Sequence, residues 1–257
     1  MSYTQTQTAT VGVLDSKMTL HVAEGLDLAP VRLRPIETLR PHMFSMRVKL
    51  AFPSAGMLAL FRSIQVRLGA TDRAPVIHFV SPRSGEGADA LALETGIAAA
   101  RSGKSVLFLD TGSGKNASLR DFRDRARQIE GEEGTHHPLP PVLALRGNPF
   151  YYTVVPQKSA GTFDQALEGR DALEHYRQIF DMVVVYSENG LSDPLAYNLY
   201  GIADGNVLVA EAERSRKPVL RDLRRMVEAQ GGRAIGAVLN KRRLYIPRFL
   251  YWLFFRG

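Results

Sequence analysis

The sequence predicts an α/β protein with a doubly wound, mainly parallel sheet and helices on both faces of that sheet. The first observation is an alternation of short apolar runs with helical stretches from residue 74 onward. The second is that these runs are apolar without interruption, as in strands that a parallel sheet buries on both faces. Hydrophobic residues make up 45% of the 257-residue chain, which is enough for one large core.

Each element can be placed by its residue pattern. Residues 55–68 are expected to form a helix, because Leu58, Phe61, Ile64 and Leu68 fall on one face. The strands are expected at 76–80, 106–109, 151–155, 182–186, 206–210 and 235–239. The helices between them are expected at 89–102, 118–128, 163–180, 194–202 and 218–230. Residues 130–147 are rich in Gly, Pro and charge and are expected to form a surface loop.

The chain divides into three regions. Residues 1–50 are expected to form an arm that is largely disordered or extended, because its start is rich in Thr and Gln and because Pro and Arg gather at 26–41. Residues 51–241 are expected to form the α/β domain, and residues 242–257 a basic, aromatic tail. Neither a secretory signal nor an apolar run long enough to cross a bilayer is visible in the sequence.

Two totals limit the chemistry. The chain has no Cys, which excludes disulfides, thiolate metal sites and Cys nucleophiles. Its net charge is +7, which favours an acidic partner such as nucleic acid, anionic lipid or an acidic protein face. Scattered charge on a soluble basic protein is the alternative. The basic residues at 214–225 allow the same two interpretations, a solvated face or a contact for an acidic partner or lipid.

The stretch Ser81–Asp89 stands between an expected strand and an expected helix. A strand, a Gly-rich turn and a helix form the setting in which backbone N–H groups cradle phosphates. The Lys that follows the last Gly of a working loop is replaced by Ala88, and the next Ser or Thr by Asp89. The loop is therefore expected to lack the charge that neutralises phosphate and the hydroxyl that binds Mg²⁺.

The remaining loop residues allow two interpretations. Gly85 and Gly87 permit a tight turn at the helix N-terminus, and Arg83 is the only cation inside the loop. Glu86 adds a second carboxylate to that of Asp89, and both would oppose a polyphosphate unless a metal or an Arg offset them. The glycines either turn the chain from strand to helix and do no more, or they still hold a phosphate group.

Three further positions bear on nucleotide chemistry. The strand at 106–109 leads into Asp110, and Gly112–Lys115 reads Gly-Ser-Gly-Lys without the full spacing of a phosphate loop. That turn is either a flexible connection or a displaced site to which Lys115 supplies a cation. The strand at 182–186 ends in Tyr186, where a nucleotide-hydrolysing α/β enzyme carries a Mg²⁺-binding Asp, and Glu188 could substitute for that Asp.

Five segments resemble, in order, motifs of the bacterial tyrosine kinases of capsule and exopolysaccharide export, which are relatives of the MinD/ParA-type P-loop ATPases. The loop keeps Ser81, Gly85, Glu86 and Gly87 of the pattern Ser-x-x-Pro-Gly-Glu-Gly-Lys-Ser/Thr. The other matching segments lie at 102–110, 180–185, 203–209 and 236–240. The resemblance covers about residues 58–241 and implies a three-layer, P-loop NTPase-like fold.

The departures from this family fall on the groups that carry catalysis. Besides the changes at Ala88 and Asp89, Gly112 replaces the second Asp of the family's Asp-x-Asp, and Tyr186 replaces the Asp of its Walker B strand. Together these changes remove the cation and both metal anchors on which phosphoryl transfer depends. We therefore expect a pseudokinase with no catalytic residues, no metal and no cofactor, or with ATP and Mg²⁺ if the site still functions. The residues of this vestigial nucleotide site are Ser81, Arg83, Gly85, Glu86, Gly87, Ala88, Asp89, Asp110 and Tyr186.

The tail has an unusual composition, since it is rich in Arg and aromatic residues and contains no acid. It is too short to span a bilayer but could lie in the membrane interface, with Arg on anionic lipid and aromatic rings at headgroup depth. Docking on the core or on another protomer is the alternative. The residues expected to contact a membrane or a partner are Lys241, Arg242, Arg243, Arg248, Tyr251, Trp252, Phe254 and Phe255.

The leading hypothesis is a non-catalytic or weakly active, tyrosine-kinase-like accessory protein of exopolysaccharide biosynthesis and export. The resemblance implies a membrane chain-length or co-polymerase protein as its partner, a cytoplasmic location at the inner membrane, and the capacity to form homo-oligomers. Two alternatives stay open: an active protein-tyrosine autokinase or ATPase that uses Arg83, Lys115 and Asp110, and a ParA-like nucleic-acid-binding module. We do not expect nucleic acid as a partner, because the aromatic residues of the tail form a block rather than interleaved stacking platforms.

Overall fold

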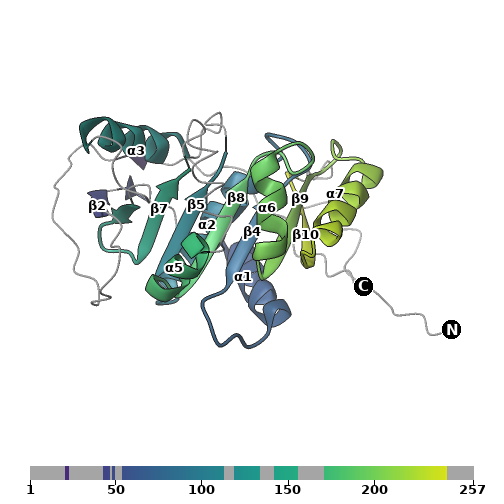
Figure 1. The fold of residues 1–257 in the computed structure, drawn as a ribbon, viewed down its shortest axis with the longest axis horizontal. Coiled ribbons are helices and arrows are strands. Elements are labelled where there is room, and N and C mark those ends of the chain that lie inside the picture. The colour runs from purple at the N-terminus through teal and green to yellow at the C-terminus, as the bar shows by residue number, and fades with distance from the viewer. Residues whose placement is uncertain are drawn as a thin grey trace, which may run out of the picture.

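The computed structural model describes residues 21–22, 43–46, 48–49, 54–112, 119–133, 142–155 and 171–241. Its main feature is an eight-stranded sheet in the order β10-β9-β4-β8-β5-β7-β6-β2 (Figure 1). All neighbouring strands are parallel except β6 and β7, which are antiparallel. The strands of this sheet are β2 (Met43–Met46), β4 (Val76–Val80), β5 (Val106–Asp110), β6 (Val142–Leu145), β7 (Phe150–Val154), β8 (Met182–Ser187), β9 (Gly205–Glu211) and β10 (Ala234–Asn240).

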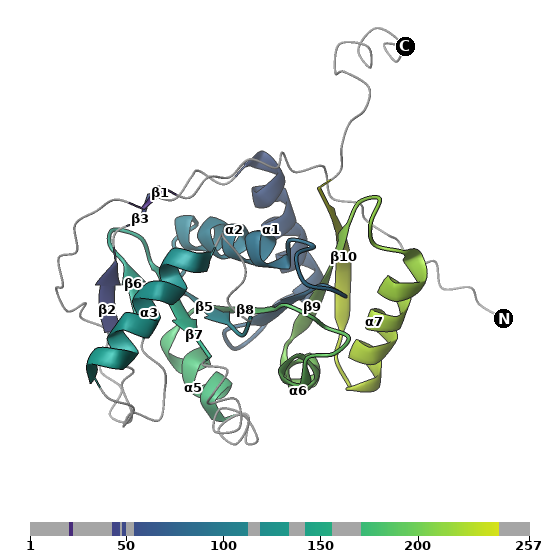
Figure 2. The same ribbon diagram turned by 90° about the horizontal axis from the view of Figure 1, so that it is seen from above.

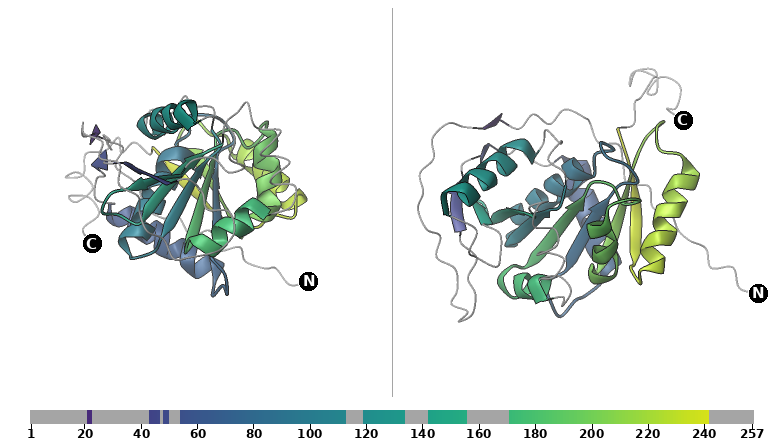
Figure 3. Two further views of the ribbon diagram at one scale, coloured as in Figure 1. Left: turned by 60° about the vertical axis from the view of Figure 1, so that its left-hand side comes forward. Right: turned by 45° about the horizontal axis from the view of Figure 1, so that its top comes forward.

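Helices cover both faces of the sheet. The helices are α1 (Ala55–Leu68), α2 (Ala88–Arg101), α3 (Arg120–Glu133), α5 (Asp171–Ile179), α6 (Pro194–Ile202) and α7 (Lys217–Ala229). Buried side chains of α1, α2 and α3 form one apolar cluster with one face of the strands, and those of α5, α6 and α7 form two clusters with the other face. Figure 2 shows α1 and α2 above the sheet and α5 and α6 below it, and Figure 3 shows the strands fanning out between the helices. The predicted doubly wound α/β fold is therefore confirmed.

Local sequence explains where the elements begin. The hydroxyl of Ser54 accepts a hydrogen bond from the backbone N–H of Met57 at 3.3 Å and caps α1. Asp193 caps α6 in the same way, and Pro194 follows in the first turn, where its missing N–H costs nothing. The central strands β4, β5 and β8 are buried along their whole length, as their mainly apolar runs predicted.

Two stretches differ from expectation. The predicted loop at 130–147 is wrong in part, because α3 continues to Glu133 and the run Val142–Leu145 forms the fully buried strand β6. Four apolar residues between loop-forming neighbours are enough for a strand once β7 and β2 offer hydrogen-bonding partners on both sides. Within the predicted arm, β2 joins the sheet beside β6, and β1 (His21–Val22) pairs with β3 (Val48–Lys49).

A chain of buried polar side chains crosses the middle of the sheet. His78 Nδ1 lies 2.9 Å from Asn206 Oδ1, and His78 Nε2 lies 2.9 Å from the hydroxyl of Ser187, which lies 2.9 Å from that of Thr111. Because Asn206 donates through Nδ2 to the carbonyl of Tyr200, its Oδ1 accepts, so His78 carries its proton on Nδ1. Burial lowers the pKa of His78 to about 4, which keeps the imidazole neutral.

Among the described helices, none is long and apolar enough to cross a membrane. The predicted membrane or partner contacts of the tail, from Arg242 to Phe255, lie outside the described residues, and so does Lys115.

Candidate functional site

The Gly-rich loop joins β4 to α2 in a tight turn. Gly85 and Gly87 have φ of 81° and 92°, in the left-handed region that favours glycine. A Cβ on Gly87 would also lie 2.0 Å from Nδ2 of Asn240, which donates a hydrogen bond to the carbonyl of Glu86 at 3.1 Å. The backbone of this turn therefore requires both glycines, whether or not a ligand binds beside it.

The first half of the loop is closed by its own hydrogen bonds. The hydroxyl of Ser81 donates to the carbonyl of Arg83 at 2.8 Å, and the Ser81 carbonyl accepts from the N–H of Gly190 at 2.9 Å. The hydroxyl of Ser84 donates to the carboxylate of Glu188. Glu188, which the sequence offered as a substitute metal ligand, thus contacts the loop, while Arg83 is exposed.

Asp89 occupies the first turn of α2, where a working loop would place a hydroxyl. Its side chain is buried, and its carboxylate accepts hydrogen bonds from the backbone N–H groups of Ala90 and of Asp89 itself. Burial raises the pKa of Asp89, although these hydrogen bonds and the charge of Arg123 oppose the rise. The chain thus supplies its own carboxylate to the helix N-terminus, which is the position that favours a phosphate. Ala88 beside it is buried and brings no charge.

Asp110, at the end of β5, is bound on both carboxylate oxygens by groups of the chain itself. Arg123 Nε donates to Oδ2 at 2.6 Å, and Arg123 Nη2 donates to Oδ1 at 2.7 Å. The hydroxyl of Tyr152 donates to Oδ2 at 2.6 Å, and the N–H of Gly112 donates to Oδ1 at 2.9 Å. The side chains of Arg123 and Asp110 are 2% and 0% exposed, so this bidentate ion pair is buried away from water.

Gly112 and Tyr186 complete this arrangement. A Cβ on Gly112 would lie 2.6 Å from Arg123 Nη2 and 2.8 Å from Cε1 of Tyr186, so no side chain fits at residue 112 while these two groups are in place. Tyr186 is buried, and burial raises its pKa above the ordinary value, with a further rise from the nearby carboxylates of Asp89 and Glu188. The sequence pattern predicted that residue 186 has lost a metal-binding carboxylate. In the structure this position holds the neutral phenol of Tyr186.

Glu86 and Lys241 lie on the side of the loop that faces β9 and β10. Burial raises the pKa of Glu86, and the hydroxyl of Ser215 opposes this rise through a hydrogen bond. The ammonium of Lys241 donates to the carbonyl of Gly85 at 2.6 Å and lies 3.4 Å from Oε2 of Glu211. Lys241, which the sequence analysis assigned to a membrane or partner contact, thus holds the loop.

Sequence reasoning missed Arg123 and Tyr152. Arg123 stands in the run Arg-Asp-Phe-Arg-Asp-Arg, which is typical of a solvated helix face, although Leu119, Phe122 and Ala126 of the same stretch form a buried stripe beside it. Tyr152 lies in a predicted strand, where it counted as one more apolar residue. Asp110 could have pointed to both residues. It is an acidic residue at the end of a buried strand, and a buried carboxylate requires hydrogen-bonding or charged partners.

ATP with Mg²⁺ is the cofactor that this fold implies, and the residues present do not fit it. The carboxylate of Asp110 is committed to Arg123 and Tyr152, and the two positions where the resemblance implies further carboxylates hold Gly112 and Tyr186. The helix N-terminus that would face a phosphate carries Asp89 instead. Among the described residues, no group of three or more His, Cys, Asp and Glu side chains is placed to hold a metal ion.

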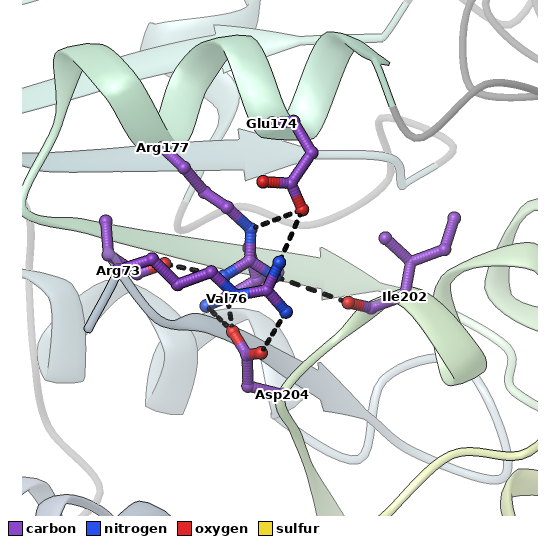
Figure 4. A network of polar contacts seen from close by, with 7 residues as sticks. Arg73, Val76, Glu174, Arg177, Ile202 and Asp204 are labelled. Atoms are coloured by element: carbon purple, nitrogen blue, oxygen red, sulfur yellow. Dashed lines mark hydrogen bonds and ion pairs between the residues drawn. The ribbon is translucent and has the colours of Figure 1, made fainter. Parts of the chain in front are cut away.

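A second carboxylate–arginine cluster lies at the opposite end of the parallel strands (Figure 4). Asp204 precedes β9, and its Oδ2 accepts from Arg177 Nη1 and from the N–H of Val76, each at 2.7 Å. Arg73 Nη2 lies 3.2 Å from Oδ1 of Asp204, and Arg73 Nη1 donates to Glu174 at 2.8 Å. The pKa of Asp204 is lowered. Burial would raise this pKa, but the hydrogen bond from Arg177 and the other interactions of the cluster outweigh the effect of burial. This cluster ties the starts of β4 and β9 to α5.

Comparison with known proteins bears on the fold. No protein-family model and no curated protein matches the chain. The solved structures that it resembles include the chimerical protein CapA2B2 (TM-score 0.61, 14% identity, 74% of this chain and 84% of that chain covered). They also include the kinase domain of the Escherichia coli tyrosine kinase ETK (0.60, 17%, 75% and 78%) and the kinase domain of VpsO (0.58, 19%, 73% and 96%).

Identities of this size show a shared fold, and the coverage shows that the shared part includes most of this chain. The predicted resemblance to bacterial tyrosine-kinase domains is thereby confirmed for the architecture. The chain has the P-loop NTPase-like α/β fold of these kinase domains.

Proposed function

We propose that the protein is a non-catalytic, tyrosine-kinase-like accessory subunit of exopolysaccharide or capsule biosynthesis and export. The observation that carries this proposal is the commitment of the Asp110 carboxylate to Arg123, Tyr152 and the N–H of Gly112. A carboxylate with both oxygens bound inside the chain is not available to hold Mg²⁺ or to accept a proton from a substrate hydroxyl.

Two likenesses support the proposed pathway. The ordered motif series from residue 81 to residue 240 resembles the capsule and exopolysaccharide kinases, and the fold resembles the kinase domains of ETK and VpsO. A subunit that has lost catalysis can still act by binding. We propose that it binds the cytoplasmic part of a membrane chain-length or co-polymerase protein, as a monomer or a homo-oligomer, at the inner membrane.

Calorimetric titration of the full chain with ATP and Mg²⁺ tests the loss of catalysis, with the kinase domain of E. coli ETK as the positive control. We expect no heat of binding at micromolar nucleotide and no phosphate transfer to tyrosine. Micromolar binding that disappears in the Asp110→Asn variant would show an active, atypical nucleotide site and would overturn the proposal.

Cell fractionation tests the proposed site of action. We expect the full chain in the membrane fraction and a chain shortened to residues 1–243 in the soluble fraction, because the shortened chain lacks all the aromatic residues of the tail together with Arg248 and Arg256. The matched control replaces Arg242, Arg243 and Arg248 by Gln, which keeps the length and the aromatic residues but removes charge. Equal membrane recovery of all three chains would contradict a role of the tail in membrane or partner contact.

A further inference from the structure

We propose that the guanidinium of Arg123 is a permanent, internal substitute for a bound divalent cation at the carboxyl edge of the sheet. This inference rests on the proposed loss of catalysis and adds a physical account of what replaced it. The starting observation is the mismatch between the fold, which implies a metal-bound nucleotide, and a site whose carboxylate is bound by the chain's own cation.

Asp110 is fully buried, and a buried carboxylate needs a compensating cation whether that cation is a metal ion or a side chain. Arg123 meets the requirement with two hydrogen bonds of 2.6 and 2.7 Å. Burial raises the pKa of Asp89, and the positive charge of Arg123 opposes that rise.

Arg123 Nη2 fills the volume next to Gly112, where a Cβ would approach it to 2.6 Å. The Nη1 atom of Arg123 is buried and has no hydrogen-bond partner in the described part of the chain. Asp110 therefore binds one edge of the guanidinium, and the other edge has no partner among the described residues.

Asp89 and Arg123 together replace the two charged groups of a metal-bound phosphate. Asp89 places a negative charge at the helix N-terminus that favours a phosphate, and Arg123 places a positive charge at the carboxylate that favours a metal ion. The chain therefore keeps both charges of a metal–phosphate pair within its own covalent structure. The carboxyl edge of the sheet is consequently held in one state that does not depend on a nucleotide.

A pair of variants at residue 123 separates charge from shape. Arg123→Gln removes the charge and keeps a long polar side chain, whereas Arg123→Lys keeps the charge as a point cation and loses the fork. We expect millimolar Mn²⁺ or methylguanidinium to raise the Tm of Arg123→Gln by about 4 °C or more, because either cation compensates Asp110 in the folded state only. We expect neither additive to change the Tm of the wild type or of Arg123→Lys.

Two controls make the result specific. Arg123→Gln combined with Asp110→Asn should lose the response, since the carboxylate that binds the added cation is gone. Arg177→Gln should also fail to respond, because Asp204 keeps the N–H of Val76 and Arg73 as partners. If Arg123→Gln does not fold alone, purification with methylguanidinium should recover it, and failure of recovery contradicts the proposal.

Two outcomes would overturn the inference. One is an equal response, or equal absence of response, of the Gln and Lys variants to added cations. Another is Mn²⁺ binding by the wild type that is lost with Asp110→Asn. Neither outcome depends on ATP, so the proposed function and the role of Arg123 can fail separately.

Discussion

Asp110 and Asp204 each bind an arginine through charge-assisted hydrogen bonds, but they lie at opposite ends of the parallel strands. Backbone groups take part in three of the hydrogen bonds of the Asp204 cluster: the N–H of Val76 donates to Asp204, and Arg177 donates to the carbonyls of Ala74 and Ile202. Its outer members are open to solvent, since the Arg73 side chain is 56% exposed. This cluster joins the ends of secondary structure elements.

The Asp110 cluster is different in composition and burial. Three of its four donated hydrogen bonds come from the side chains of Arg123 and Tyr152, and it is sealed from water. It lies at the carboxyl ends of the strands, which is where ligands bind in open α/β sheets. An ion pair alone therefore gives little information on function, whereas its position in the sheet and the source of its other partners separate a structural contact from the replacement of a ligand.

The largest effect should come from removing each arginine in turn. Arg123→Met leaves Asp110 as an uncompensated buried carboxylate, and we expect a loss of about 3–5 kcal/mol in the free energy of unfolding, measured with urea. Arg177→Met should cost less, about 1–3 kcal/mol, because Asp204 keeps the N–H of Val76 and Arg73. Equal losses would remove the difference between the two clusters.

His78 lies on β4 between the two clusters and should make the middle of the sheet sensitive to acid. Its folded pKa of about 4 lies below the unfolded value of 6.5, so its contribution is complete above pH 6.5 and is lost as the pH falls toward 4. The difference corresponds to about 3 kcal/mol. His78→Gln should flatten the stability profile between pH 6.5 and 4, and an unchanged slope would show that other groups cause it.

The hydroxyl of Tyr152 offers a smaller and cleaner test of the sealed cluster. Tyr152→Phe removes one donor to the buried Asp110, and we expect a loss of about 1–3 kcal/mol in the free energy of unfolding. Tyr151→Phe is the matched control, since Tyr151 is the neighbouring residue on β7 and packs into the cluster on the other face of the sheet. Its effect should stay within about 0.5 kcal/mol.

Arg73 should show the smallest effect. The Arg73 side chain is 56% exposed in its pairs with Glu174 and Asp204, and ion pairs of solvent-exposed side chains contribute about 1 kcal/mol or less. We expect Arg73→Gln to lower the free energy of unfolding by no more than this, and less in high salt. A loss as large as that of Arg177→Met would mean that the cluster acts as one cooperative unit rather than as a core with a solvated rim.

The fold could be predicted because its signals are local. Uninterrupted apolar runs identified β4, β5, β7, β8, β9 and β10, and turn residues separated them from the helices. The four-residue strand β6 was missed because it is too short for its pattern to stand out and depends on partners elsewhere in the chain. The same is true of β2, whose strand character comes from its pairing with β6.

The sequence predicted which catalytic groups the candidate site lacks, but it did not predict which side chains take their place. Ala88, Asp89, Gly112 and Tyr186 could be aligned with a motif, so the missing groups were visible in the sequence. The partner of Asp110 could not be named, because Arg123 lies on a helix whose placement against β5 and β7 is a property of the packed fold. A motif reports the residues that it expects, and it gives no information on the side chain that takes their place.

We expect the Gly-rich loop between β4 and α2 to become fixed late in folding, because Asn240 and Lys241 hold it. They contact the carbonyls of Glu86 and Gly85 across 154 and 156 residues of sequence. Contacts of such separation form only after the intervening chain has closed, and β10 comes last in sequence among the described strands. We therefore expect the nascent chain to carry this loop without its C-terminal contacts until the last strand arrives, so that completion of the sheet and fixation of the loop become a single event.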